Sequence, residues 1–341
     1  MWKVEYIQGA TWFVQKELTL KGLSSGIISA DEQYTYLTKA SISLDQLKSL
    51  QTVTKVYSVV QHSDYSPKYL SKHKSIIRKA LFVLNETMDD FESFQIKCAG
   101  DDTPEVQSII RYLSQELAIP HDINSPDLKI QIIKQNDNLW ELTIQLTHRP
   151  LSAREYKVSH LSGALNPTIA HGMNLLAGVD SQASVLNPCC GSATLLIEAL
   201  HCNPNIKTAI GFDIEREALS ASLDNIKQAG LIRKIKIQTL DIMEALPPHI
   251  ANQKFEAIVS DLPFGMAISK YLDLESLYTR YIEIAERCLT PNGALVTITS
   301  QDHLFQDIIK HSTLRIAKQI PLRQMTTAGE YLETTVFLCR K

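Results

Sequence analysis

Long apolar runs are missing from this chain, and so is any regular arrangement of cysteine. Hydrophobic residues make up 44% of the 341 positions, yet no run approaches the roughly 20 apolar residues of a membrane-spanning helix. The first residues lack the charged-then-apolar pattern of a signal peptide. The six cysteines form no C-x-x-C pair, which argues against a zinc site and a disulfide framework. We therefore expect a reduced, cytoplasmic protein with no metal and no membrane contact.

A strong excess of one charge is also absent. The chain has 34 lysines and arginines against 37 acids, a net charge of −3. Many nucleic-acid-binding proteins are strongly basic, so any contact with RNA or DNA must come from a local patch. The composition is that of a folded globular protein, and the length suits two or three domains.

The first half of the chain alternates short strands and helices. Residues 1–61 read as strand, helix, strand, strand, helix, strand, an order that suits a small ferredoxin-like unit. Residues 62–150 then predict a helix, a strand, a second helix and a hairpin. The expected elements are Trp2–Ile7, Trp12–Leu20, Gly26–Leu37, Leu44–Leu50, Val53–Val60, Pro67–Ala80, Phe94–Cys98, Pro104–Leu117, Leu128–Ile133 and Leu139–Leu146.

One of these expected helices, residues 67–80, carries positive charge without any acid. A solvated helix face is one interpretation of this pattern. A phosphate-contacting patch is the other, favoured because the charges cluster within four turns of a chain that is acidic overall. The side chains concerned are Lys68, Lys72, Lys74, Arg78 and Lys79.

The second half alternates strands with helices, which predicts a parallel, doubly wound α/β sheet. No crossover helix fits between the last two strands, so we expect these to pair antiparallel. A seven-stranded sheet with an antiparallel last strand is similar to that of class I methyltransferases. The expected elements are Gly163–Gly178, Ala183–Leu186, Leu195–Leu200, Thr208–Phe212, Glu215–Gln228, Ile235–Leu240, Ala257–Ser260, Leu274–Cys288, Ala294–Thr299, His303–His311, Leu314–Ile320 and Glu333–Cys339.

Three strand ends in this half carry residues suited to a nucleotide cofactor. Small residues in Asn187–Thr194 let a ligand approach the backbone, and the helix start that follows suits a carboxylate. Asp213 can bond both hydroxyls of a ribose. Asp241 can accept from an adenine amino group, with Ile214 and Ile242 on either side of the ring. Each acid alone could be a cap or a surface residue. Together they favour S-adenosylmethionine over NAD, whose loop normally has the pattern G-x-G-x-x-G.

The fourth strand ends in Asp261-Leu262-Pro263-Phe264, similar to the (Asn/Asp)-x-Pro-(Tyr/Phe) signature of methyltransferases that act on exocyclic amines of bases. Such an amine shares its lone pair with the ring, so an acceptor such as Asp261 must bond its N–H groups before the nitrogen can attack. Phe264 would stack on the base, worth about 1–3 kcal/mol, and Pro263 would stiffen the loop. The alternative is a plain strand turn with a buried phenylalanine.

Cysteine chemistry on the base is not expected. C5-pyrimidine methyltransferases need a thiolate nucleophile, and no cysteine lies between residues 259 and 267. Cys189 and Cys190 fall in the cofactor loop, where small soft residues pack.

The whole chain resembles the THUMP-containing tRNA guanine-N2 methyltransferases. The resemblance rests on the strand with Pro126–Ile130, on the exit at Leu151–Lys157 (L-x-x-R-x-Y-K), on N-P-C-C-G-S-A-T and on D-L-P-F-G. It implies a ferredoxin-like domain at 1–61, a THUMP RNA-binding domain at 62–150 and a methyltransferase domain at 151–341.

The resemblance implies methylation of a guanosine N2 amine in tRNA, at position 6 of the acceptor stem. Position 10, rRNA or a small nuclear RNA are alternatives, as is a weakly active RNA-binding scaffold. It also implies a small activator subunit and a monomer or weak dimer. In the catalytic role it places Asp261, Leu262, Pro263 and Phe264. Around the cofactor it places Pro167, Thr168, Asn187, Pro188, Cys189, Gly191, Ala193, Thr194, Asp213, Ile214, Asp241 and Ile242. RNA would meet the basic helix together with Arg149 and Arg154.

Two residues depart from the family pattern. An acid and a glycine are usual where this chain has Asn187 and Ala193. Asparagine still accepts hydrogen bonds but lacks the charge that would attract the ammonium of the methionine part, and alanine narrows the loop. Weaker cofactor binding is the expected consequence.

Overall fold

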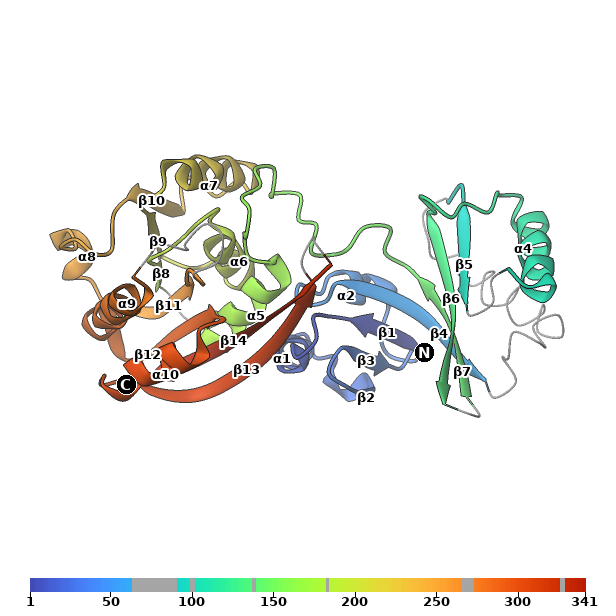
Figure 1. Cartoon of the computed structure of the whole chain (residues 1–341), viewed down its shortest axis with the longest axis horizontal. Helices are drawn as coiled ribbons and strands as arrows, with labels where there is room; N and C mark the ends of the chain where they lie inside the picture. The colour runs from blue at the N-terminus through green and yellow to red at the C-terminus, as the bar shows by residue number, and fades with distance from the viewer. Residues whose placement is uncertain (63–90, 99–101, 137–138, 182–183, 265–272, 326–328) are drawn as a thin grey trace. The chain divides into compact units, whose positions relative to one another are not determined.

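The computed structural model describes residues 1–62, 91–98, 102–136, 139–181, 184–264, 273–325 and 329–341 (Figure 1). By their internal contacts these fall into two compact units. Unit 1 comprises residues 1–5, 23–50 and 54–151, and unit 2 comprises residues 6–22, 51–53 and 152–341. Among the described residues, no helix is long and apolar enough to cross a membrane. The expected basic helix at 67–80 lies outside the described residues.

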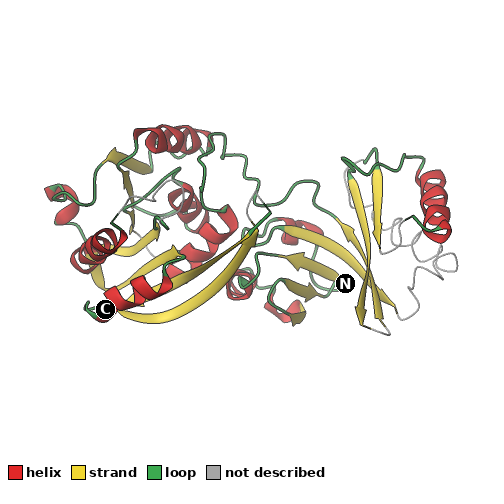
Figure 2. Ribbon diagram, in the orientation of Figure 1, coloured by secondary structure: helices red, strands yellow, loops and turns green. Residues whose placement is uncertain are grey.

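Unit 1 is built on one seven-stranded mixed sheet (Figure 2). The strand order is β2-β3-β1-β4-β7-β6-β5, with β5 and β6 parallel and the other neighbours antiparallel. Helix α2 starts at a capping box in which Ser43 and Gln46 bond each other's backbone N–H. The elements are β1 Trp2–Glu5, β2 Ile27–Ala30, β3 Tyr34–Leu37, α2 Leu44–Lys48, β4 Lys55–His62, β5 Phe94–Cys98, α4 Pro104–Leu117, β6 Leu128–Asn136 and β7 Leu139–Gln145, with a short 3₁₀ turn at Ser24–Gly26.

Unit 2 is built on a second seven-stranded sheet, in the order β10-β9-β8-β11-β12-β14-β13. Strand β14 pairs antiparallel with β13, as the sequence predicted, and also with β12, while the other pairs are parallel. The elements are α1 Thr11–Leu20, α5 Pro167–Ala177, β8 Ser184–Asn187, α6 Thr194–Cys202, β9 Thr208–Asp213, α7 Arg216–Gln228, β10 Ile235–Thr239, α8 Pro248–Ala251, β11 Phe255–Asp261, α9 Leu274–Cys288, β12 Leu289–Thr299, α10 Asp302–Lys310, β13 Arg315–Met325 and β14 Tyr331–Arg340. The predicted α/β class I methyltransferase arrangement is confirmed.

Helix α5 is the most buried helix element of unit 2, because every one of its residues lies in the interior. It begins at Pro167 with Asn166 as its cap and ends at Gly178 in the left-handed conformation. Helix α1 packs against it, and Gly172 makes this possible, since a Cβ there would lie 2.3 Å from the ring of Phe13. Helix α5 thus contacts α1 as well as strands β11 and β12 of the sheet.

Candidate cofactor and base-binding site

The carboxyl ends of four parallel strands meet at one edge of the unit 2 sheet. Strands β10, β9, β8 and β11 are neighbours, and in register Asn187 lies beside Gly211 and Thr239 beside Asp213. Ligands of open α/β sheets bind at this edge. The fold thus brings the predicted residues at the ends of these strands, Asn187, Asp213 and Asp261 among them, to a common edge.

The loop after β8 folds back onto the end of β9. The N–H of Gly191 donates to Oδ2 of Asp213 over 2.8 Å, and its carbonyl accepts from the Ser222 hydroxyl over 2.6 Å. Gly191 and Ala193 both have left-handed backbone, with φ of 51° and 61°, a conformation that costs a non-glycine residue about 1–2 kcal/mol. The N–H of Ala193 closes the turn by bonding the carbonyl of Cys190 at 2.8 Å. The loop therefore keeps a turn suited to glycine although alanine occupies it.

Asn187 is buried, with 1% of its surface exposed. Its Oδ1 accepts from the N–H of Cys189 and from the hydroxyl of Ser260, each over 3.3 Å. Its Nδ2 has no hydrogen-bond partner among the described residues. A buried donor left in this way costs about 1–3 kcal/mol. The accepting role expected for Asn187 is already filled, and the remaining group is a donor that fits the carboxylate of the methionine part of S-adenosylmethionine.

Two carboxylates stand at the ends of β9 and β10. Oδ1 of Asp213 accepts from the N–H of Glu215 over 3.0 Å, and Oδ1 of Asp241 accepts from the N–H of Met243 over 2.9 Å. These bonds fix the orientation of both side chains. Because a carboxylate offers about four lone-pair positions, each can also accept from ribose hydroxyls or an adenine amine, as predicted for them.

The two isoleucines predicted to flank the adenine differ in their surroundings. Ile214 is 56% exposed and offers an open apolar face, whereas Ile242 is 5% exposed and packs in the core. The backbone around Ile242 is held from α9, because Arg280 donates from Nε to its carbonyl and from Nη2 to the carbonyl of Glu244, each over 3.0 Å. These two hydrogen bonds from Arg280 therefore hold the backbone of the loop that carries Asp241 in place.

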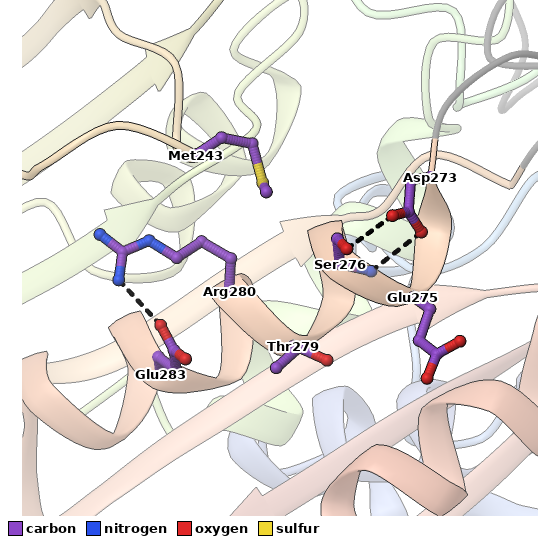
Figure 3. Close-up of a pocket in the computed structure, with 7 residues that line it drawn as sticks. All are labelled: Met243, Asp273, Glu275, Ser276, Thr279, Arg280 and Glu283. Atoms are coloured by element: carbon purple, nitrogen blue, oxygen red, sulfur yellow. Dashed lines mark hydrogen bonds and ion pairs between the residues drawn. The ribbon is translucent and has the colours of Figure 1, made fainter.

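An open hollow of about 340 Å³ lies beside this loop and along α9 (Figure 3). Its walls include Met243, Arg280 and the acids Asp273, Glu275 and Glu283. Nη1 of Arg280 is paired with Glu283 over 2.8 Å, so the acids dominate the charge of the hollow and disfavour phosphate. None of the predicted site residues lines it. We place neither cofactor nor RNA there.

The other predicted cofactor residues lie at helix starts and in the loop between them. Pro167 and Thr168 open α5, where Oδ1 of Asn166 accepts from both the N–H and the hydroxyl of Thr168 at 2.9 Å. Pro188 is buried after β8, and Thr194 begins α6. Unpaired N–H groups at a helix start suit an anionic ligand.

Asp261 is the last residue of β11. The next residue, Leu262, is 1% exposed and donates its N–H to the carbonyl of Ile298 over 3.2 Å, which anchors the loop in the core. Burial raises the pKa of the Asp261 carboxyl to about 7, while the positive charge of Lys157 acts in the opposite direction. The acceptor therefore changes charge close to neutral pH.

The carbonyl groups of the base-binding loop are fixed by two further side chains. The hydroxyl of Tyr278 donates to the carbonyl of Pro263 over 2.7 Å and also bonds the hydroxyl of Thr299 at 2.7 Å. Nε2 of Gln301 donates to the carbonyl of Phe264 over 2.8 Å. The ring of Phe264 is partly exposed, as stacking on a base requires. The loop is thus preorganised by residues outside the tetrapeptide.

The cysteines of the cofactor loop are poorly suited to nucleophilic chemistry. Burial raises the pKa of Cys190 to about 12 and that of Cys189 well above its ordinary range. Both thiols therefore stay protonated at neutral pH, and a thiol is a weak nucleophile.

Of the predicted RNA contacts, Arg149 is exposed in unit 1, and the lysines and arginine of the basic helix lie outside the described residues. Arg154 has other partners. Its side chain is 9% exposed, Nε donates to Glu198 over 2.9 Å, and Nη2 donates to the carbonyl of Gln51 over 2.7 Å. The guanidinium is engaged inside unit 2, so we no longer assign it to RNA.

Sequence reasoning missed the residues that hold the site together: Glu198, Tyr278, Arg280 and Gln301. Each acts through a hydrogen bond or ion pair with a residue more than ten positions away in sequence. No spacing pattern in the sequence predicts such a bond. Of these four residues, only Glu198 could have been recognised in the sequence. It is an acid among the apolar residues of 194–200, which is unusual for a buried helix.

Sheet order and site together define a class I, S-adenosylmethionine-dependent methyltransferase. Residues 154–330, slightly more than half of the chain, match the family UPF0020, described as RMKL-like methyltransferase domain. The chain belongs to this family.

Two named relatives and one solved structure are similar to this chain. The chain is 33% identical over 182 residues to the bovine U6 snRNA (guanine-N(2))-methyltransferase THUMPD2, covering 53% of this chain and 34% of that protein. It thus spans about a third of that relative's length. It is 24% identical over 285 residues to the tRNA (guanine(6)-N2)-methyltransferase of Archaeoglobus fulgidus, covering 76% and 69%. The crystal structure of TrmN from Thermus thermophilus has the same fold, with a TM-score of 0.73, 18% identity and coverage of 100% and 99%.

Proposed function

We propose that this protein transfers a methyl group from S-adenosylmethionine to the N2 amine of a guanosine in tRNA, at position 6 of the acceptor stem. The observation that carries the proposal is Asp261, an acceptor at a strand end followed by a loop whose carbonyls are fixed by Tyr278 and Gln301. A fixed acceptor of this kind is what an aromatic amine requires, because its lone pair must be withdrawn from the ring before it reacts.

In this proposal the protein binds and orients the base. Asp261 accepts from an N–H of the amine, Phe264 stacks on the ring, and the short Leu262–Pro263 connection keeps the two at a fixed separation. The cofactor, when bound, supplies a methyl group on a positively charged sulfur. On taking up this methyl group, the amine nitrogen would release one proton to water, and the sulfur would be left as a neutral thioether.

The same proposal assigns the cofactor to the residues at the sheet edge. Asn187 would donate to the methionine part, together with the loop from Pro188 to Thr194 and the start of α5. Asp213 would accept from the ribose and Asp241 from the adenine. Arg280 holds the last of these in position.

We propose that unit 1 binds the RNA substrate. The division into a ferredoxin-like domain at 1–61, a THUMP domain at 62–150 and a methyltransferase domain at 151–341 belongs to this proposal, as do the basic helix and Arg149 as phosphate contacts. So do a small activator subunit, a monomeric or weakly dimeric state and a cytoplasmic location. The six cysteines are all free, which fits a reducing compartment.

A small nuclear RNA is the second candidate substrate. The observation that favours it is the 33% identity to a relative named for U6 snRNA, which exceeds the 24% identity to the relative named for tRNA position 6. Position 10 of tRNA and rRNA are further targets for the same chemistry.

The test is to incubate the protein with isotope-labelled S-adenosylmethionine and, in parallel, unmodified total tRNA, U6 snRNA and rRNA. Digestion and mass spectrometry identify the methylated nucleoside. N2-methylguanosine in tRNA alone supports the proposal, and its appearance in U6 snRNA alone selects the second candidate. No labelled nucleoside in any RNA, with cofactor binding intact by calorimetry, would favour an RNA-binding scaffold. Asp261→Asn is the matched inactive control.

A further inference from the structure

Strands β13 and β14 extend past the rest of the unit 2 sheet, at the edge where the candidate site lies (Figure 1). Strand β11, which ends at Asp261, pairs in parallel with β12. The last pair of β12 with β14 joins Thr299 to Thr335. Beyond that pair, β13 and β14 continue alone for four more pairs, the last of which joins Met325 to Tyr331. At about 3.3 Å per residue, this hairpin end stands roughly 16 Å beyond the row of residues that holds Asp261.

One face of the hairpin end continues from the start of α10, which also holds the base-binding loop. Side chains alternate between the two faces of a strand, so Tyr331 and Thr335 share a face. The hydroxyl of Thr335 donates to Oδ2 of Asp302 over 2.6 Å. Asp302 follows Gln301, whose Nε2 donates to the carbonyl of Phe264. The hairpin end and the base-binding loop are therefore both bonded to the same helix start.

This face carries an arginine stacked on a tyrosine. The guanidinium carbon of Arg323 lies 4.1 Å from the centre of the ring of Tyr331. Tyr331 is 57% exposed, and Met325 opposite it is 69% exposed. Exposed Glu333 lies 4.0 Å from Nε of Arg323, and Glu330 is also exposed, so the acids disfavour a phosphate here. A flat stack of guanidinium and ring suits an unpaired nucleobase instead.

The backbone of the hairpin end is held along the outer edge of β13. The N–H of Arg323 donates to the carbonyl of Gln8 over 3.0 Å, and the two residues form an isolated bridge. At the next position, Gly9, a Cβ would lie 2.0 Å from the carbonyl oxygen of Pro321, so glycine is needed for the segment to run this close to the strand. Arg323 is thus fixed before any ligand arrives, which lowers the entropy lost on binding.

We propose that Arg323 and Tyr331 form a second stacking surface, which binds an unpaired nucleotide close to the target guanosine in the bound RNA. The inference rests on the proposed function, because a base that reaches the sheet edge brings its neighbours in the strand across the same edge. Enzymes that extract a base from its stack take part of their sequence preference from contacts to flanking nucleotides. The hairpin end supplies such a contact beside the base-binding loop.

Crosslinking locates the contact. The full chain with p-benzoylphenylalanine in place of Tyr331 is irradiated with unmodified total tRNA and, separately, with U6 snRNA, and primer extension maps the attached nucleotide. We expect adducts within a few nucleotides of the guanosine that is methylated. The same probe in place of Arg315 is the control, because this exposed residue lies at the opposite end of β13. Adducts only at distant nucleotides overturn the inference. Adducts only with protein also overturn it and make the hairpin end a protein-docking surface.

RNA affinity gives the second readout. Tyr331→Leu should weaken RNA binding about fivefold or more, the scale of one lost base–aromatic stack, whereas Tyr331→Trp should bind as the wild type does. Arg323→Met should weaken binding by more than Arg315→Met, which removes one positive charge from the same strand. Filter binding measures these affinities, and calorimetry with S-adenosylmethionine, whose affinity should not change, shows that the variants are folded.

Wild-type RNA affinity in Tyr331→Leu would overturn the inference while leaving methyl transfer, and so the proposed function, intact. A wild type that binds RNA but methylates none overturns the proposed function instead. In that case the affinities of Tyr331→Leu and Tyr331→Trp still show whether the hairpin end stacks on a base.

Discussion

The guanidinium of Arg280 donates from Nε to the carbonyl oxygen of Ile242 over 3.0 Å, joining α9 to the loop that follows β10. This contact connects a helix without predicted site residues to the residues proposed to bind adenine. The loop with the residues proposed to bind adenine is therefore held by a side chain that lies 38 positions away in sequence.

Arg280→Met should weaken S-adenosylmethionine binding by up to roughly thirtyfold, because two hydrogen bonds of about 1 kcal/mol each no longer hold the loop. Isothermal calorimetry measures the dissociation constant. Arg287→Met is the matched control, since Arg287 also lies on α9 and also bonds a carbonyl, that of Ala251 at 3.1 Å. An equal loss of affinity in both variants would show a general effect of α9 rather than one on this loop.

Asp261→Asn should lower the rate of methyl transfer by roughly 10²–10³, the scale of losing one preorganised group, with cofactor affinity unchanged within a few-fold. In the wild type the rate should rise with pH around 7, because the carboxyl is protonated below its pKa of about 7. Rate measurements from pH 5.5 to 9 test both points. Normal turnover by Asp261→Asn would remove this residue from the mechanism.

The same carboxyl predicts a pH-dependent stability. Its folded pKa of about 7 exceeds the ordinary value of 3.8, so ionisation costs the folded state stability as pH rises from 3.8 to 7, and the full cost is present above 7. Asp261→Asn removes the ionisable group. Its melting temperature should exceed that of the wild type at pH 8 by more than at pH 5, as differential scanning calorimetry would record.

Tyr278→Phe should release the carbonyl of Pro263 and lower methyl transfer about fivefold, the scale of one hydrogen bond of about 1 kcal/mol. Cofactor affinity should stay the same, because Tyr278 bonds the base-binding loop. Tyr281→Phe is the control: the hydroxyl of Tyr281 is buried on the same helix and has no bond to residues 261–264. Equal rates of methyl transfer in Tyr278→Phe and Tyr281→Phe would show that the bond to the carbonyl of Pro263 does not contribute to catalysis.

Reversing Lys72, Lys74 and Arg78 to glutamate should weaken RNA binding and flatten the slope of log affinity against log salt by about 2, because each lost phosphate contact removes released counterions. Filter binding at several salt concentrations measures both. Reversal of Lys227 and Lys236, exposed lysines of unit 2, is the control. Unchanged affinity in the first variant would make this segment an ordinary solvated helix.

The spacing of apolar residues, together with the positions of proline and glycine, predicted most of the helices and strands. The bounds of Phe94–Cys98, Pro104–Leu117 and Leu274–Cys288 agree with the structure residue for residue, because each begins and ends at clear polar or proline signals. Strand β12 begins at Leu289, earlier than expected, since its first residues, with a proline and a glycine, read as a turn. Helix α8 was missed for the same reason, because Pro247 and Pro248 read as chain breakers.

The site was predictable where a residue type implies its chemistry at a strand end, as for Asp213 and Asp261. It was not predictable where function depends on which donor reaches which acceptor. Asn187 read as an acceptor, but Cys189 and Ser260 occupy its oxygen. Arg154 read as an RNA contact, but Glu198 binds it. The hydrogen-bond partners of Asn187 and Arg154 are decided by tertiary packing, which a local sequence pattern does not predict.

Strand β14 lies between β12 and β13, both of which precede it in the chain. Within the described sheet, β13 is joined to the other strands only through β14. The sheet can therefore be completed only when the last strand is present, and removing the residues from Tyr331 onward would leave β13 and the edge of β12 without their partner. Such unpaired strand edges invite pairing with other chains.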